Sequence, residues 1–376
     1  MKDSLTQGRY DYFVLQSSTA GGYALNQFLN THPDIHMPTR EIVDQLFDTG
    51  QEVSLCAESG DPLLVPPWSR EYKLGFLLHS RVQINEGIPA RVAALCKPDA
   101  QLFQLVRDPV KVIVASHKRY LQINMFNEVA KQLKMPGYQL TVPERTPEEV
   151  YEWLKPRLFY YQQAQRFAAD FKEYRIVDAT DIWPEQIDAT MRRLYGQIGV
   201  NDEFSSAYFH KDFHGFLQRM LEFSRVELNL YGHHVPVRME VADNVPFVGD
   251  TFSVEIARIN RDITLLGGET REVQLALVAN SVQWNVLPEK LKAYLGGSDD
   301  LQHFLETELL PQWDQLYQHV KTHIEERWVR RLPEKLLNKM RADLSDDYRQ
   351  IFKVRPDLES LWNWEMSASE RQAAYG

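Results

Sequence analysis

The sequence predicts an α/β fold built on a doubly wound parallel sheet, with an inserted antiparallel β segment and C-terminal helices. Short apolar runs alternate with helical stretches in the first half, which is the pattern of a parallel sheet covered by helices. Apolar and polar residues alternate strictly after about residue 230, which is typical of antiparallel strands. Helical periodicity then returns from residue 288 onward.

Four strands are expected in the parallel sheet, and the first covers residues 12–15. This strand leads through a loop of small residues into a helix expected from residue 23 to residue 30. Crossover helices between parallel strands give a doubly wound sheet, whose ligands bind beyond the carboxyl ends of the strands. The other three strands are expected at 73–78, 102–106 and 174–178, with helices between them that include 110–120 and 147–171.

The second half of the chain divides into an insertion and a closing segment. We expect a core over residues 1–225, a β-rich and helical insertion over 226–325, and C-terminal helices over 326–376 that complete the core. Within the insertion, strands are expected at 235–241, 252–257 and 273–278, and an amphipathic helix at 301–325.

Composition narrows the possible classes of protein. The net charge of −10 argues against a nucleic-acid partner, because such proteins need a positive surface. No segment is apolar enough to cross a membrane, and the N-terminus lacks a secretory signal, so we expect a cytoplasmic protein with no membrane partner. Cys56 and Cys96 are expected to be reduced thiols, and the spacing of potential ligands predicts no metal site.

The loop after the first expected strand has the composition of a phosphate site. Small side chains allow backbone N–H groups to approach an anion, and the following helix adds partial positive charge at its N-terminus. The alternative is a plain strand-to-helix turn that uses glycine for its geometry. The residues expected to contact a phosphate are Ser17, Ser18, Thr19, Ala20, Gly21, Gly22 and Tyr23.

A second candidate element follows the third expected strand. Arg107, Asp108 and Pro109 stand between that strand and the next helix, so Arg107 is expected to face the ligand crevice. A guanidinium suits a phosphate because it donates two parallel hydrogen bonds. The alternative is a surface ion pair between Arg107 and Asp108, which would contribute little.

These elements resemble those of the sulfotransferases that use 3′-phosphoadenosine-5′-phosphosulfate (PAPS). The run from Phe13 to His32-Pro33-Asp34-Ile35 is similar to the first strand, loop and helix of that family. The resemblance implies a P-loop-like sulfotransferase core, PAPS as cofactor and 3′-phosphoadenosine-5′-phosphate as product. It implies that residues 17–23 bind the 5′-phosphosulfate and that Arg107 and Ser116 bind the 3′-phosphate. The family serine commonly falls one residue earlier, at the position of Ala115.

The resemblance extends to residues 174–200 and to the region 328–365, but two family features are missing. Thr19 stands where the family loop has a basic residue, with Arg40 and Lys73 as possible substitutes for that cation. A late Arg-Lys-Gly stretch that covers the 3′-phosphate in the family has no match in this chain.

Two residues are candidates for the base that takes the acceptor proton. Glu41 resembles the glutamate base of carbohydrate and protein-tyrosine sulfotransferases, and its alternative role is a first-turn glutamate of a helix at residues 42–47. His79 ends the second expected strand, where small-molecule sulfotransferases carry a histidine, and its alternative is a structural histidine.

The expected activity is transfer of a sulfuryl group from PAPS to a hydroxyl or amine. A small molecule, a carbohydrate and a carrier-bound intermediate all remain open as the acceptor. One rival is a sulfotransferase-like binding protein that lost turnover, which Thr19 favours. The other is a P-loop kinase-like phosphotransferase, which the absence of a Gly-Lys-Ser/Thr sequence in the loop argues against.

Overall fold

A computed structural model divides the chain into two units. The first contains residues 1–115, 147–210 and 331–376, and the second contains residues 116–146 and 211–330. The residues that the structure describes are 10–17, 20–37, 72–79, 87–132, 143–158, 164, 167, 171, 173–201, 216–217, 220–221, 225–230, 233–242, 253–280, 287–295 and 299–362.

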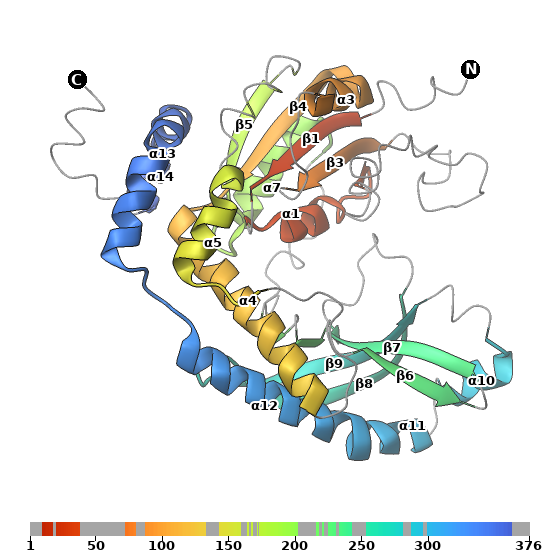
Figure 1. The fold of residues 1–376 in the computed structure, drawn as a ribbon. Coiled ribbons are helices and arrows are strands. Elements are labelled where there is room, and N and C mark those ends of the chain that lie inside the picture. The colour runs from red at the N-terminus through yellow and green to blue at the C-terminus, as the bar shows by residue number, and fades with distance from the viewer. Residues whose placement is uncertain are drawn as a thin grey trace. The chain divides into compact units, whose positions relative to one another are not determined.

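The described residues of the first unit form a five-stranded parallel sheet of order β2-β3-β1-β4-β5 (Figure 1). This sheet, with the antiparallel sheet described below, confirms the predicted fold class. The sequence prediction missed β2, which is two residues long and sits at the sheet's edge. The strands are β1 (Tyr10–Gln16), β2 (Ile35–His36), β3 (Lys73–His79), β4 (Cys96–Val106) and β5 (Glu173–Asp178).

Strand β1 lies at the centre of this sheet and is buried on both faces. Phe13 and Leu15 pack on one face against Phe76, Phe167 and other buried side chains, with the Phe13 and Phe76 ring centroids 4.9 Å apart. The near-continuous apolar sequence of β1 follows from this position, because a central parallel strand has no solvent-facing side.

Helices connect and flank the strands of the first unit. Within the predicted helix over 147–171, the first α-helix ends at Leu154 and a short 3₁₀ turn follows, because Pro156 has no N–H to donate. Residues 164 and 167, further along the same range, are again α-helical. The helical segments are α1 (Gly22–Leu29), α3 (Gly87–Leu95), α5 (Pro147–Leu154), η1 (Lys155–Arg157), η2 (Ala179–Ile182), α7 (Ile187–Ile198), α13 (Glu334–Val354) and α14 (Asp357–Leu361).

The second unit contains a four-stranded antiparallel sheet of order β6-β7-β9-β8 among its described residues. Strand β6 was not predicted. The strands are β6 (Arg225–Leu230), β7 (His233–Val241), β8 (Ser253–Thr264) and β9 (Thr270–Asn280), and the helical segments are α10 (Glu289–Leu295), α11 (Asp299–Phe304), the π-helical turn η5 (Leu305–Leu309) and α12 (Leu310–Arg327).

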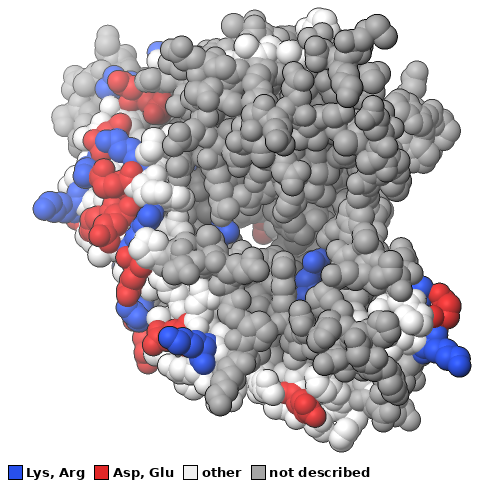
Figure 2. All heavy atoms as spheres, turned by 45° about the vertical axis from the view of Figure 1, so that its right-hand side comes forward, with Lys and Arg blue, Asp and Glu red and all other residues white. Residues whose placement is uncertain are grey.

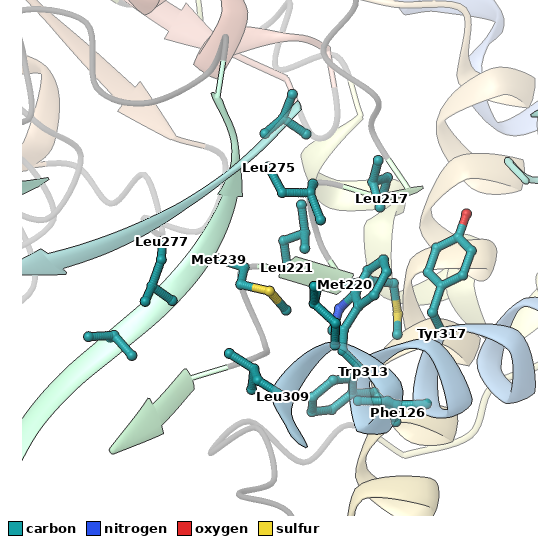
Figure 3. Close-up of a cluster of buried hydrophobic side chains, with 14 of the residues drawn as sticks. Phe126, Leu217, Met220, Leu221, Met239, Leu275, Leu277, Leu309, Trp313 and Tyr317 are labelled. Atoms are coloured by element: carbon teal, nitrogen blue, oxygen red, sulfur yellow. The ribbon is translucent and has the colours of Figure 1, made fainter. Parts of the chain in front are cut away.

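The antiparallel sheet of the second unit packs against helices and shares one hydrophobic core with them. Trp313 and Tyr317 of α12 stack with ring centroids 5.0 Å apart, and Figure 3 shows them beside Phe126 and Met220. Phe126 belongs to α4 (Pro109–Gln132), which starts in the first unit and whose later residues pack in this core.

Charged side chains of both signs alternate along the described part of the surface in Figure 2. On that face the described residues therefore present no broad patch of one sign. Among the helices that the structure describes, none combines the length and the apolar character that crossing a membrane requires.

Candidate functional site

Four neighbouring strands of the parallel sheet end at the same level. Gln16 at the end of β1 pairs with His79 at the end of β3, and also with Leu105 of β4. Val106 at the end of β4 pairs with Asp178 at the end of β5. Strands β2 and β3, which follow β1 in the chain, lie on one side of β1 in the sheet, and β4 and β5 lie on its other side. Strands β1 and β4 therefore flank the switch point, where ligands of such sheets bind.

The small-residue loop (residues 17–22) leaves β1 at this switch point. The backbone N–H of Ser17 donates to the carbonyl oxygen of Leu105 at 2.9 Å, which ties the start of the loop to β4. The Ser17 side chain is fully buried, and its Oγ finds no hydrogen-bond partner among the residues that the structure describes. Ser18 and Thr19 lie outside the described residues.

Two glycines bring the loop backbone close to its surroundings. Gly21 has a φ of +91°, and a Cβ at this position would lie 2.9 Å from Cδ1 of Ile182. A Cβ on Gly22 would lie 2.1 Å from Oε1 of Gln16. Helix α1 starts at Gly22 without an acidic residue in its first turn, so its N-terminal N–H groups keep their partial positive charge. The backbone of Tyr23 lies in this turn.

Arg107 follows β4 directly and is half-buried. Burial lowers the pKa of its guanidinium, while the nearby Asp108 and Asp178 carboxylates act in the opposite direction. Asp108 caps α4, because its Oδ1 accepts the N–H of Val110 at 2.9 Å. Asp108 is buried rather than at the surface, and the alternative of an ion pair between Arg107 and Asp108 stays open.

Asp178 is a buried carboxylate at this edge to which the sequence analysis gave no role. Its Oδ2 accepts the indole N–H of Trp362 at 2.9 Å, and its Oδ1 accepts the N–H and the hydroxyl of Thr180 at 2.9 and 2.5 Å. Burial raises its pKa, and these hydrogen bonds oppose the increase. The hydrogen bond from Trp362, which is 184 residues away, shows that Asp178 links the end of β5 to the C-terminal part of the chain.

The turn η2 after β5 is anchored from the C-terminal helices. Arg355 donates to both carboxylate oxygens of Asp181 at 2.8 and 3.1 Å, and to the carbonyl oxygen of Ile176 at 3.1 Å. Ile182 of η2 packs against Gly21 of the small-residue loop. The ion pair between Arg355 and Asp181 therefore stabilises a turn that contacts this loop. The sequence offered no signal for a partnership across 174 residues.

The remaining candidate residues have different outcomes. His79 is the last residue of β3, level with Gln16, and the structure describes only its backbone. Glu41 and Arg40 lie outside the described residues. Ser116 is buried on α4, about two helical turns beyond Pro109. The base and the serine role therefore stay predictions.

The prediction that Lys73 could replace the basic residue of the family loop is wrong. It begins β3, six residues before His79, and therefore lies about 20 Å from the carboxyl edge of the sheet. Its ammonium pairs there with Asp11 at 3.5 Å.

Comparison with known proteins yields likeness in structure alone. No family model matches the sequence, and no curated protein matches it. A sulfotransferase from Alicyclobacillus acidocaldarius matches with a TM-score of 0.34 and 14% identity, over 57% of this chain and 91% of that one. A likeness of this size assigns neither a family nor a function to the chain.

Proposed function

We propose that this chain is a sulfotransferase that binds PAPS and transfers its sulfuryl group to a hydroxyl or amine of an acceptor. The proposal rests on one observation, which is that the neighbouring strands β1 and β4 end at the same edge of the sheet, at the switch point. The buried hydroxyl of Ser17, which has no hydrogen-bond partner among the described residues, follows one strand, and Arg107 follows the other. Backbone N–H groups, a hydroxyl donor and a guanidinium are the groups that proteins use to bind phosphate esters.

The residues at this edge suit the two anionic ends of the cofactor. The small-residue loop and the N-terminus of α1 would hold the 5′-phosphosulfate, and Arg107 would hold the 3′-phosphate, with Ser116 as a further proposed contact. PAPS, when bound, supplies an activated sulfuryl group whose leaving group is a phosphate. The protein's own residues would orient this group and offset the negative charge on the leaving phosphate. Glu41 or His79 would take the proton from the hydroxyl or amine that receives the sulfuryl group.

Nucleotide binding is the first test of this function. Adenosine 3′,5′-bisphosphate, the desulfated product, should raise the unfolding temperature, because a ligand selective for the folded state stabilises it by about 2.7 kcal/mol at 100 times its Kd. ATP with magnesium should stabilise the protein far less. Equal stabilisation by ATP would favour the phosphotransferase alternative instead.

Arg107→Ala tests the position of the nucleotide. We expect a loss of bisphosphate affinity of roughly 10- to 100-fold, the usual contribution of a charge-assisted contact, with an unchanged unfolding temperature. Arg175→Ala is the matched control, because Arg175 is an exposed arginine of the same sheet that pairs with Glu173. Unchanged affinity in Arg107→Ala would remove Arg107 from the site.

Turnover distinguishes an enzyme from a binding protein. Transfer from radiolabelled PAPS to a mixed panel of alcohols, sugars and amines should occur with the wild type, and Glu41→Gln should reduce it by roughly 10²-fold at unchanged bisphosphate affinity. If Glu41→Gln keeps the wild-type rate of transfer and His79→Asn shows no transfer, His79 is the base. Bisphosphate binding with no transfer to any acceptor would favour the binding-protein alternative.

A further inference from the structure

Gln16, the last residue of β1, turns its side chain over the start of α1. Gln16 is only 6% exposed and lies between the ends of β3 and β4, where it pairs with His79 and Leu105. A Cβ on Gly22, the first residue of α1, would overlap the Oε1 and Cδ atoms of Gln16. The Gln16 carboxamide therefore occupies the space that any side chain at position 22 would need.

The carboxamide of Gln16 makes no hydrogen bond with any residue that the structure describes. Buried glutamines normally have partners, and Gln104 of the same sheet accepts a hydrogen bond from the Tyr174 hydroxyl. Ser17, the next residue, is fully buried, and its Oγ also has no partner within the described part of the chain. Two consecutive buried side chains thus have polar groups that the described residues leave available.

These two side chains belong to the segment that joins β1 to the N-terminus of α1. The first turn of α1 contains no acidic residue, and no described side chain caps its N–H groups, because Gly21 stands at the N-cap. The N–H groups of this turn therefore present partial positive charge. An anion bound there would meet these N–H groups, the Ser17 hydroxyl and the Gln16 carboxamide, all of which are neutral donors.

We propose that Gln16 binds the anionic group of the ligand at the N-terminus of α1, through hydrogen bonds from its Nε2. This inference rests on the proposed function, in which that group is the 5′-phosphosulfate. The sequence analysis placed the contacts to this group within residues 17–23 and gave Gln16 no role. Nε2 carries two N–H donors, and a half-turn of the carboxamide exchanges it with Oε1. Gly22 completes the arrangement, because only glycine leaves room for the carboxamide at this position.

Two nucleotides that differ only in the 5′-phosphate isolate this contact. Calorimetric titrations with adenosine 3′,5′-bisphosphate and adenosine 3′-monophosphate are made on the wild type, Gln16→Met and Gln104→Met. Gln16→Met keeps the length of the side chain and removes both N–H donors. It should therefore weaken bisphosphate binding by roughly tenfold or more, and change 3′-monophosphate binding by less than about threefold.

The unfolding temperature of the unliganded protein distinguishes binding from a structural role. Gln16→Met replaces a buried amide by an apolar side chain of similar size, so this temperature should stay the same or rise. Gln104→Met is the matched control, because it removes the acceptor of the Tyr174 hydroxyl. It should lower the unfolding temperature and leave bisphosphate affinity unchanged. If Gln16→Met behaves as Gln104→Met should, Gln16 has a structural role only and the inference is wrong.

Gly22→Ala tests the same contact without changing Gln16. The added Cβ would force the carboxamide away from the start of α1, so bisphosphate affinity should fall by a factor similar to that of Gln16→Met. In Gln16→Ala this space is empty, so adding Gly22→Ala should reduce the affinity by less than about a further threefold. A further loss as large as that of Gly22→Ala alone would show that the Cβ acts independently of Gln16, which contradicts the inference.

Failure of this inference is distinguishable from failure of the proposed function. If Gln16→Met and Gly22→Ala bind both nucleotides as the wild type does, Gln16 does not contact the 5′-anion, although the proposed function stands. If the wild type binds neither nucleotide, the proposed function fails and the inference fails with it.

Discussion

Substitution of Gly21 by alanine tests the geometry of the small-residue loop. Gly21 has a φ of +91°, in the left-handed region, where an L-residue with a Cβ is destabilised by about 1–2 kcal/mol. The added Cβ would also lie 2.9 Å from Cδ1 of Ile182, which must leave its preferred rotamer at a cost of about 0.5–1.5 kcal/mol. We therefore expect Gly21→Ala to lower the free energy of unfolding by about 2–3 kcal/mol.

A double-mutant cycle separates the two contributions. Ile182→Val deletes Cδ1, so it should cost about 0.5–1.5 kcal/mol alone and much less when Ala occupies position 21. The backbone strain at position 21 should persist in the double variant. Urea unfolding of the wild type, both single variants and the double variant, followed by circular dichroism, measures each term.

Gly196→Ala is the matched control for this cycle. Gly196 is an exposed residue of α7, and a Cβ there would meet nothing within 4 Å. Because alanine has the higher helix propensity, this variant should be more stable by about 0.5–1 kcal/mol. The reasoning fails if Gly21→Ala unfolds within about 0.5 kcal/mol of the wild type. Strictly additive effects of Gly21→Ala and Ile182→Val would refute the contact between them.

Two further predictions concern the supports of the same unit. Arg355→Ala should lower the unfolding free energy by on the order of 2 kcal/mol in urea titrations, because the largely buried Asp181 carboxylate loses two charge-assisted hydrogen bonds and keeps only Arg193 at 3.7 Å, and an effect below about 1 kcal/mol would contradict that role. Burial raises the pKa of Cys96 to about 12, so in a Cys56→Ser variant the native thiol should resist alkylation between pH 7 and about 9, whereas rapid labelling that rises with pH near 8.5 would show an accessible thiol.

Local sequence patterns determined much of the fold. The mainly apolar runs at 12–15, 73–78, 102–106 and 174–178 each lie within a parallel strand, since a strand that is covered on both faces needs mostly apolar side chains. The small residues 17–22 and the position of Arg107 directly after β4 also placed the candidate site at the carboxyl edge of the sheet. These features depend on neighbouring residues only, so one sequence is enough to predict them.

Tertiary structure decided which distant residues meet. The sequence does not predict that Trp362 donates to Asp178 or that Arg355 pairs with Asp181, because each pair is more than 170 residues apart and neither partner carries a local pattern. The spacing of hydrophobic residues indicates which face of a helix or strand is buried, whereas the packing of the whole chain determines which residues cover that face.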